Sequence, residues 1–89
     1  MESSRWENFT KSQQLLTIGA EFMRAKIWQN KDKEKFLLAL ERALELVDST
    51  ISDPKWQNDL PMIMGLRQEV SKFYADLRSD DILCLYKAL

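Results

Sequence analysis

Apolar residues recur along most of the chain at intervals of three and four, the spacing of one face of an α-helix. No segment alternates between apolar and polar residues for long enough to predict a strand. The predicted helices cover residues 10–29, 33–51 and 61–78, with a short fourth helix after Ser79. We therefore predict an all-α fold, a small antiparallel bundle of three main helices plus a short C-terminal fourth helix that dimerises.

The predicted helix ends depend on residues that cap or interrupt a helix. Thr10 and Gln13 fit a capping box at the start of the first main helix, with residues 4–9 as a preceding turn or an extension of it. Residues 52–61 hold both prolines, which predicts a loop or a single distorted turn after the second helix. Asp80 and Asp81 are expected in the first turn of the fourth helix, where the helix dipole favours acids.

The first main helix has two apolar seams on opposite sides, although a surface helix normally has one. The first seam consists of Leu16, Ala20, Met23 and Ile27, extended backwards by Phe9. The second seam consists of Leu15, Ile18, Phe22 and Ala25, with Gly19 beside it. We expect the first seam to face the core and the second to be surplus, with Gly19 allowing another backbone to approach.

The surplus seam predicts a protein interface. The short fourth helix is expected to hide only part of it, and a symmetric pairing with a second copy of the chain would bury the rest. The interface candidates are Leu15, Ile18, Gly19, Phe22, Ala25, Trp28 and Leu38. A monomer that covers both seams by itself is the alternative.

Composition narrows the classes of partner. The chain has 89 residues and one cysteine, and its formal net charge is −1. We expect a single domain over residues 1–89, without the basic field that attracts nucleic acid. No apolar run is long enough to span a bilayer, so we expect a cytoplasmic protein that does not enter membranes and has the character of a small bacterial one.

Candidate chemistry is sparse. The chain contains no histidine, which removes the commonest general base and metal ligand, and no glycine-rich phosphate loop. Glu41, Glu45 and Asp48 lie on one helix face, and we interpret them as a solvated face, with cation binding left open. Cys84 is expected to be a packed thiol. We predict no catalytic, cofactor or metal site.

The function expected from these patterns is that of a small cytoplasmic assembly or adaptor protein that binds a second copy of itself or another protein. One alternative is an RNA-associated or regulatory module that uses the basic turn of Lys31, Lys33 and Lys35. Another is a carrier of a small apolar ligand held near Met23, Met62 and Met64.

The tryptophans are expected to have different roles. Trp6 and Trp56 should close the ends of the core. Trp28 either anchors a partner or packs on Trp56.

Overall fold

The helical prediction is confirmed. The computed structural model describes residues 3–89, with side chains from Arg5 onward, and this part of the chain contains no strand. The helices are α1 (Ser3–Glu7), α2 (Lys11–Trp28), α3 (Lys33–Ile51), α4 (Leu60–Tyr74) and α5 (Leu83–Lys87), with the 3-10 helix η1 (Pro54–Asp59) between α3 and α4. Residues 4–9 thus belong mainly to a separate short helix and do not extend α2.

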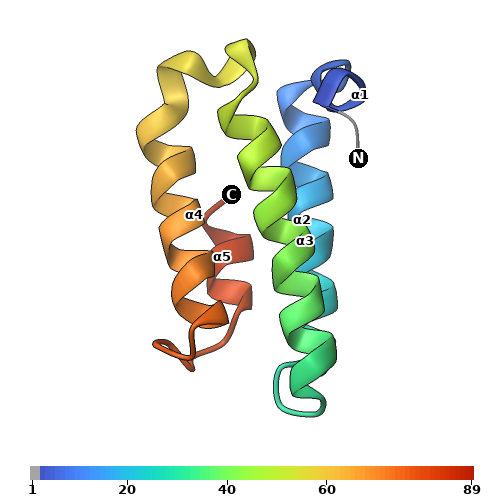
Figure 1. Ribbon diagram of the computed structural model, residues 1–89, viewed down its shortest axis with the longest axis vertical. Helices are drawn as coiled ribbons and strands as arrows, with labels where there is room; N and C mark the ends of the chain where they lie inside the picture. Colours follow the sequence, from blue (N-terminus) through green and yellow to red (C-terminus); the bar gives the residue numbers. More distant parts are fainter. Residues whose placement is uncertain (1–2) are drawn as a thin grey trace.

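The helices pack around α3, which runs antiparallel to α2 and contacts both α2 and α4 along its length (Figure 1). The short helix α5 lies against α2 and, to a smaller extent, against α4. Helix α5 returns from the far end of α4, so that the chain ends beside the middle of the longer helices (Figure 1).

The starts of α2 and α3 follow from their capping residues. The Gln13 backbone N–H donates to Thr10 Oγ1 at 3.1 Å, and the Thr10 N–H donates to Gln13 Oε1 at 2.9 Å, which completes the predicted capping box. Asp32 caps α3 by accepting a hydrogen bond from the Lys35 N–H at 3.2 Å.

Helix α4 ends earlier than predicted. Asp76 takes a left-handed conformation with φ 61°, the Leu77 N–H donates to the Lys72 carbonyl, and the Asp76 N–H donates to the Phe73 carbonyl. This pair of bonds closes a helix end in a Schellman motif, so the helix stops at Tyr74 instead of continuing to residue 78.

Helix α5 begins later than predicted. Ser79 does not cap it, because the helix starts only at Leu83. The prediction that Asp80 and Asp81 lie in the first turn of this helix is also wrong, because both residues precede it. Asp81 Oδ1 nevertheless accepts a hydrogen bond from the Leu83 N–H at 2.9 Å at the helix start.

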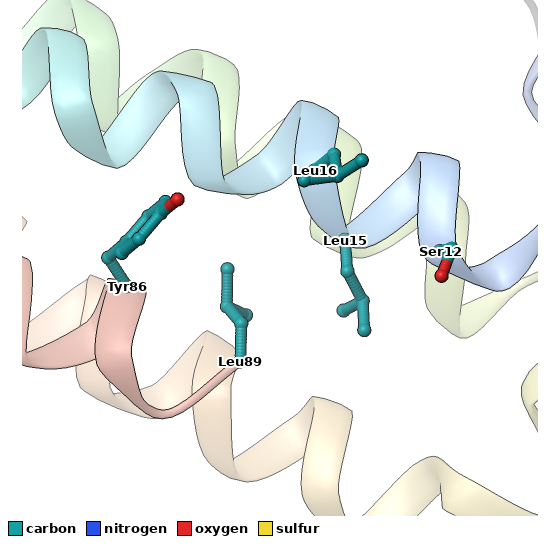
Figure 2. Close-up of a pocket in the computed structure, with 5 residues that line it drawn as sticks. All are labelled: Ser12, Leu15, Leu16, Tyr86 and Leu89. Atoms are coloured by element: carbon teal, nitrogen blue, oxygen red, sulfur yellow. The ribbon is translucent and has the colours of Figure 1, made fainter.

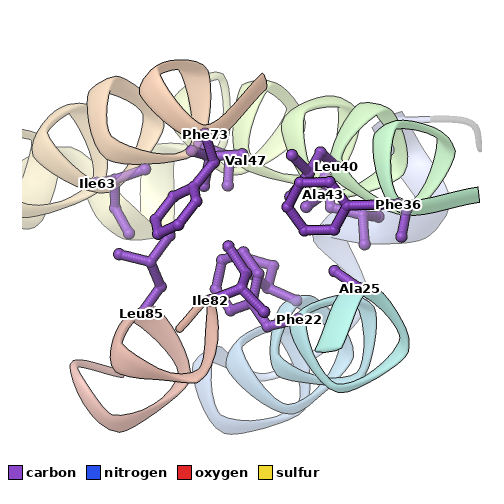
Figure 3. Packing of buried hydrophobic residues seen from close by; sticks show 14 of the residues in the cluster. Phe22, Ala25, Phe36, Leu40, Ala43, Val47, Ile63, Phe73, Ile82 and Leu85 are labelled. Carbon is purple, nitrogen blue, oxygen red and sulfur yellow. The ribbon is translucent and has the colours of Figure 1, made fainter. Parts of the chain in front are cut away.

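The core lies where α2, α3, α4 and α5 meet (Figure 3). Helix α2 contributes Ile18, Phe22 and Ala25, all fully buried. The other helices and the turn before α5 add Phe36, Leu40, Ala43, Val47, Ile63, Phe73, Ile82 and Leu85 (Figure 3).

The prediction that the Leu16 seam faces the core is wrong, and the two seams of α2 are exchanged. Leu16, Met23 and Ile27 are 68%, 50% and 55% exposed, whereas Ile18 and Phe22 are inaccessible to solvent. The reason is tertiary: both α3 and α5 pack on the Ile18 side of α2, so that seam is buried within one chain.

Candidate functional site

The exposed apolar face of α2 is the strongest candidate for a functional site. It consists of Leu16, Ala20, Met23 and Ile27, hereafter the α2 stripe, all four of which are exposed. Their spacing of four, three and four residues keeps them on one side of the helix, opposite the buried seam. A row of exposed apolar side chains is typical of a surface that binds another molecule.

Helix α5 and the chain end widen the apolar surface along one edge of the stripe. Tyr86, which is 41% exposed, and Leu89 reach toward α2 and border a cleft with Leu15, Leu16 and Ser12 (Figure 2). The cleft has a volume of about 300 Å³, at the lower end of the roughly 300–1,000 Å³ typical of small-molecule pockets, and it opens to solvent. Because the cleft is open, it can accept a side chain that protrudes from a partner protein better than it can enclose a small ligand.

The charged residues at the rim of the stripe are paired within the chain. Arg24 Nη1 lies 3.1 Å from Glu21 Oε1, and Lys26 Nζ lies 3.0 Å from Asp81 Oδ2. Hydrogen bonds from the Leu83 backbone and from Lys26 hold the pKa of Asp81 below its ordinary value, so its carboxylate stays charged opposite Lys26. The stripe is therefore an uncharged face between compensated ion pairs.

The predicted interface residues of the other seam do not form a surface. Ile18, Gly19, Phe22 and Ala25 are buried inside the single chain, and Leu15 is half-buried. These residues belong to the core because α3 and α5 cover them, which corrects the prediction that they are a surplus face.

Gly19 is closely approached, but by the side chains of Tyr86 on α5 and of Leu89 in the same chain and not by another backbone as expected. A β-carbon added at Gly19 would lie 2.9 Å from Cε2 of the Tyr86 ring and 3.3 Å from Leu89 Cδ1. A side chain at this position would force the Tyr86 and Leu89 side chains to move.

The remaining interface candidates lie away from the α2 stripe. Leu38 on α3 is 51% exposed, as predicted, and no other large exposed apolar residue of α3 accompanies it. Trp28 is half-buried at the end of α2, and Lys35 Nζ lies 4.2 Å from the centroid of its ring. In this cation–π contact Lys35, one of the charged residues of the basic turn, covers part of the Trp28 ring.

The basic turn is only partly free. Lys33 Nζ lies 3.9 Å from Asp76 Oδ2, and Lys35 is over Trp28. The turn therefore offers less uncompensated charge to a phosphate backbone than its sequence suggested.

Trp6 and Trp56 are buried, in agreement with their predicted role at an end of the core. The Trp56 indole donates to Gln14 Oε1, and Lys11 Nζ lies 4.9 Å from the Trp56 ring. Because Gln14 is near the start of α2 and Trp28 is at its end, the suggestion that Trp56 packs on Trp28 is wrong.

A buried polar cluster that sequence reasoning missed joins α1, α2, α3 and η1. Gln14 Nε2 donates to the Trp6 carbonyl at 2.9 Å and to Asp53 Oδ2 at 2.8 Å, and Trp6 Nε1 donates to Thr50 Oγ1 at 3.0 Å. In the described residues no buried side-chain nitrogen or oxygen atom lacks a hydrogen-bond partner. The cluster is fully satisfied, which is typical of a structural clamp.

Asp53 is the charged member of this cluster. Burial alone would raise its pKa, but hydrogen bonds from Lys55 and Gln14 outweigh that effect and hold the pKa below its ordinary value. Lys55 Nζ lies 2.7 Å from Asp53 Oδ2 and also donates to the Glu7 carbonyl. The sequence signal for the buried polar cluster was weak, because a single Gln on a helix, such as Gln14, gives no sign that its side chain is buried.

Cys84 is near the charged side chains of Arg78 and Asp80. Arg78 Nη2 donates to Cys84 Sγ at 2.9 Å and also binds Asp80. Burial raises the pKa of the Cys84 thiol, although the Arg78 guanidinium pulls it down. The thiol is therefore less ionised than a free cysteine, in line with its predicted role as a packed residue.

The acidic residues of α3 do not gather into a cation site. Glu41, Glu45 and Asp48 are exposed, and Asp48 Oδ1 accepts a hydrogen bond from Arg67 Nε at 2.6 Å. Within the residues that the structure describes, no group of three or more potential ligands could hold a metal ion.

The methionines proposed to hold a ligand do not share a pocket. Met23 is on the α2 stripe, while Met62 and Met64 are exposed on α4. An apolar cleft between α2, α4 and α5 has a volume of about 160 Å³, which is below the roughly 300 Å³ of the smallest typical ligand pockets.

Two further observations bear on the class of protein. None of the helices described is both long and apolar enough to cross a membrane. Comparison with known protein families, characterised proteins and solved structures finds no match to this chain.

Proposed function

We propose that this chain is a non-catalytic assembly or adaptor protein that binds another protein chain through the α2 stripe. The observation that carries the proposal is the row of Leu16, Met23 and Ile27. Each of these residues is at least half exposed on the face of α2 that α3 and α5 leave uncovered. Burying such side chains against a partner stabilises a complex by about 25 cal/mol for each Å² of apolar surface removed from water.

The chemistry of the remaining surface supports a binding role over catalysis. The chain has no histidine, and burial raises the pKa of the Cys84 thiol, which makes it a weaker nucleophile than a free cysteine. In this proposal the protein works in the cytoplasm, where a single unpaired cysteine is common.

The proposal is tested with two matched substitutions. Met23→Glu puts a charge in the α2 stripe, and Leu38→Glu puts the same charge on a residue of α3 with the same exposure. Wild-type protein and both variants are compared for self-association by light scattering and for capture of other proteins from an extract of their own cells. Helical circular dichroism checks that each variant is folded.

We expect Met23→Glu to abolish association with a protein chain, because a carboxylate would have to be desolvated in an apolar contact. Leu38→Glu should leave that association intact. If neither self-association nor capture depends on Met23, the α2 stripe is not a binding site and the proposal is wrong.

A further inference from the structure

We infer that the partner of the α2 stripe is a second copy of this chain, with the two α2 helices packed antiparallel about a two-fold axis. The inference rests on the proposed function and adds the identity and orientation of the partner. A two-fold pair requires a surface that is complementary to itself, and the α2 stripe meets that requirement in spacing, in side-chain size and in charge.

The spacing of the stripe is the same in both directions along the helix. Four, three and four residues separate Leu16, Ala20, Met23 and Ile27, so an antiparallel copy brings all four positions into register. This is the alternating spacing of the seam positions of a coiled coil, which pack as knobs into holes. Leu16 then lies opposite Ile27 of the second copy, and Ala20 lies opposite Met23 of the second copy.

The side-chain sizes fit this register. The small Ala20 faces the long, flexible Met23, and the two branched residues of similar volume face each other. A parallel pair would instead place Met23 against Met23 and Ala20 against Ala20. One layer of that pair would be crowded and the next would leave a void, and both faults reduce packing.

The charges favour the same orientation. Arg24 and Lys26 flank the second half of the stripe, while the first half is flanked by the neutral Ser12, Gln13 and Thr17. An antiparallel pair puts the basic half of each helix beside the neutral half of the other. A parallel pair would place the Arg24–Glu21 and Lys26–Asp81 ion pairs beside their own copies, which would crowd all the charged groups at one end of the contact.

The charged residues beside the stripe are already paired, so they offer little attraction to a strongly charged partner. Arg24 and Lys26 already have acidic partners in their own chain, at 3.1 and 3.0 Å. A neighbour with the same neutral apolar stripe leaves these pairs intact.

The expected dimer is a weak one. The stripe spans about 16 Å from Leu16 to Ile27, which is eleven steps of 1.5 Å along the helix. A contact surface of this length and one helix wide is smaller than the roughly 800 Å² that each partner contributes to a standard interface, even when Tyr86 and Leu89 are included. We therefore expect a dissociation constant in the micromolar range, visible as a monomer–dimer transition over a dilution series.

Disulfide crosslinking tests the orientation. Leu16→Cys and Ile27→Cys are made separately in a Cys84→Ser background, with one variant labelled with heavy nitrogen so that mass spectrometry tells the chains apart. Each variant is oxidised alone, and then the two are oxidised as a mixture. In the antiparallel pair, residue 16 of one copy meets residue 27 of the other, and two residues at position 16 lie about 16 Å apart along the axis, too far for a disulfide.

We expect the mixture to form a disulfide between labelled and unlabelled chains, while each variant alone forms none. Crosslinking of each variant with itself would overturn the antiparallel orientation. A wild-type protein that stays monomeric at all concentrations, without crosslinking in any sample, would overturn pairing with a second copy.

A further comparison separates this inference from the proposed function. In the dilution series, Met23→Glu should raise the dissociation constant of the dimer about a hundredfold. Leu38→Glu should leave the constant within about twofold, because single exposed side chains outside an interface contribute little. A dimer that Met23→Glu leaves intact would mean that the copies meet through another face, and the inference would be wrong. A monomer that still captures another protein through Met23 would overturn the inference and leave the proposed function standing.

Discussion

Gly19 on α2 and Tyr86 on α5 approach so closely that a β-carbon on Gly19 would lie 2.9 Å from the Tyr86 ring. This contact is one of several between the short helix α5 and α2. We expect Gly19→Leu to lower the free energy of unfolding by about 1–3 kcal/mol, because the added side chain would overpack the contact. Urea denaturation followed by circular dichroism measures the change.

Gly65 provides the matched control, since a β-carbon there would meet no atom within 4 Å. Gly65→Leu should raise the free energy of unfolding by about 0.5–1 kcal/mol, because glycine is a poor helix former and leucine a good one. Equal effects of the two substitutions would show that α5 does not rest on Gly19.

Gln14 should be important for stability although it is polar. Gln14→Leu would leave the Trp56 indole N–H without its acceptor, whereas the Trp6 carbonyl would keep the Phe9 N–H as a donor. The loss is expected to be about 1–3 kcal/mol for the buried indole N–H left unpaired, measured by urea denaturation. Gln68→Leu, at an exposed position of α4, should change stability little, and similar losses for both variants would contradict the clamp role.

Asp53 should make part of the stability depend on pH. Its pKa is lower in the folded chain than in the unfolded chain, so its contribution is present above the unfolded pKa and is lost as the pH falls through the folded value. Thermal unfolding is measured between neutral and acidic pH for wild type and Asp53→Asn. The difference in stability between the two should shrink on acidification, and a difference that is constant with pH would refute this role.

Cys84 should react slowly with thiol reagents. Its pKa is raised by burial, and only the thiolate form attacks such reagents. At mildly alkaline pH we expect labelling by iodoacetamide to be slower than that of glutathione under the same conditions, and to speed up in denaturant. A native-state rate equal to that of glutathione would show that the thiol is accessible and ionised.

Local sequence signals were sufficient for much of the secondary structure. The Thr10 capping box and the run of strong helix formers in residues 33–51 placed the starts of α2 and α3 correctly, because caps and helix propensity act within a few residues. The end of α4 was predicted too late, because Asp76 adopts a left-handed conformation that its residue type permits but does not require.

The sequence by itself determined that the chain is helical, that α2 is apolar on two opposite sides and that one of those sides is surplus. Only the tertiary structure decided which side is buried, because periodicity describes the faces of a helix without saying where its neighbours lie. The close contact of Tyr86 and Leu89 with Gly19, together with the packing of α3, buries the Ile18 seam and leaves Leu16, Met23 and Ile27 in water. The candidate binding site therefore depends on long-range packing, which no local pattern encodes.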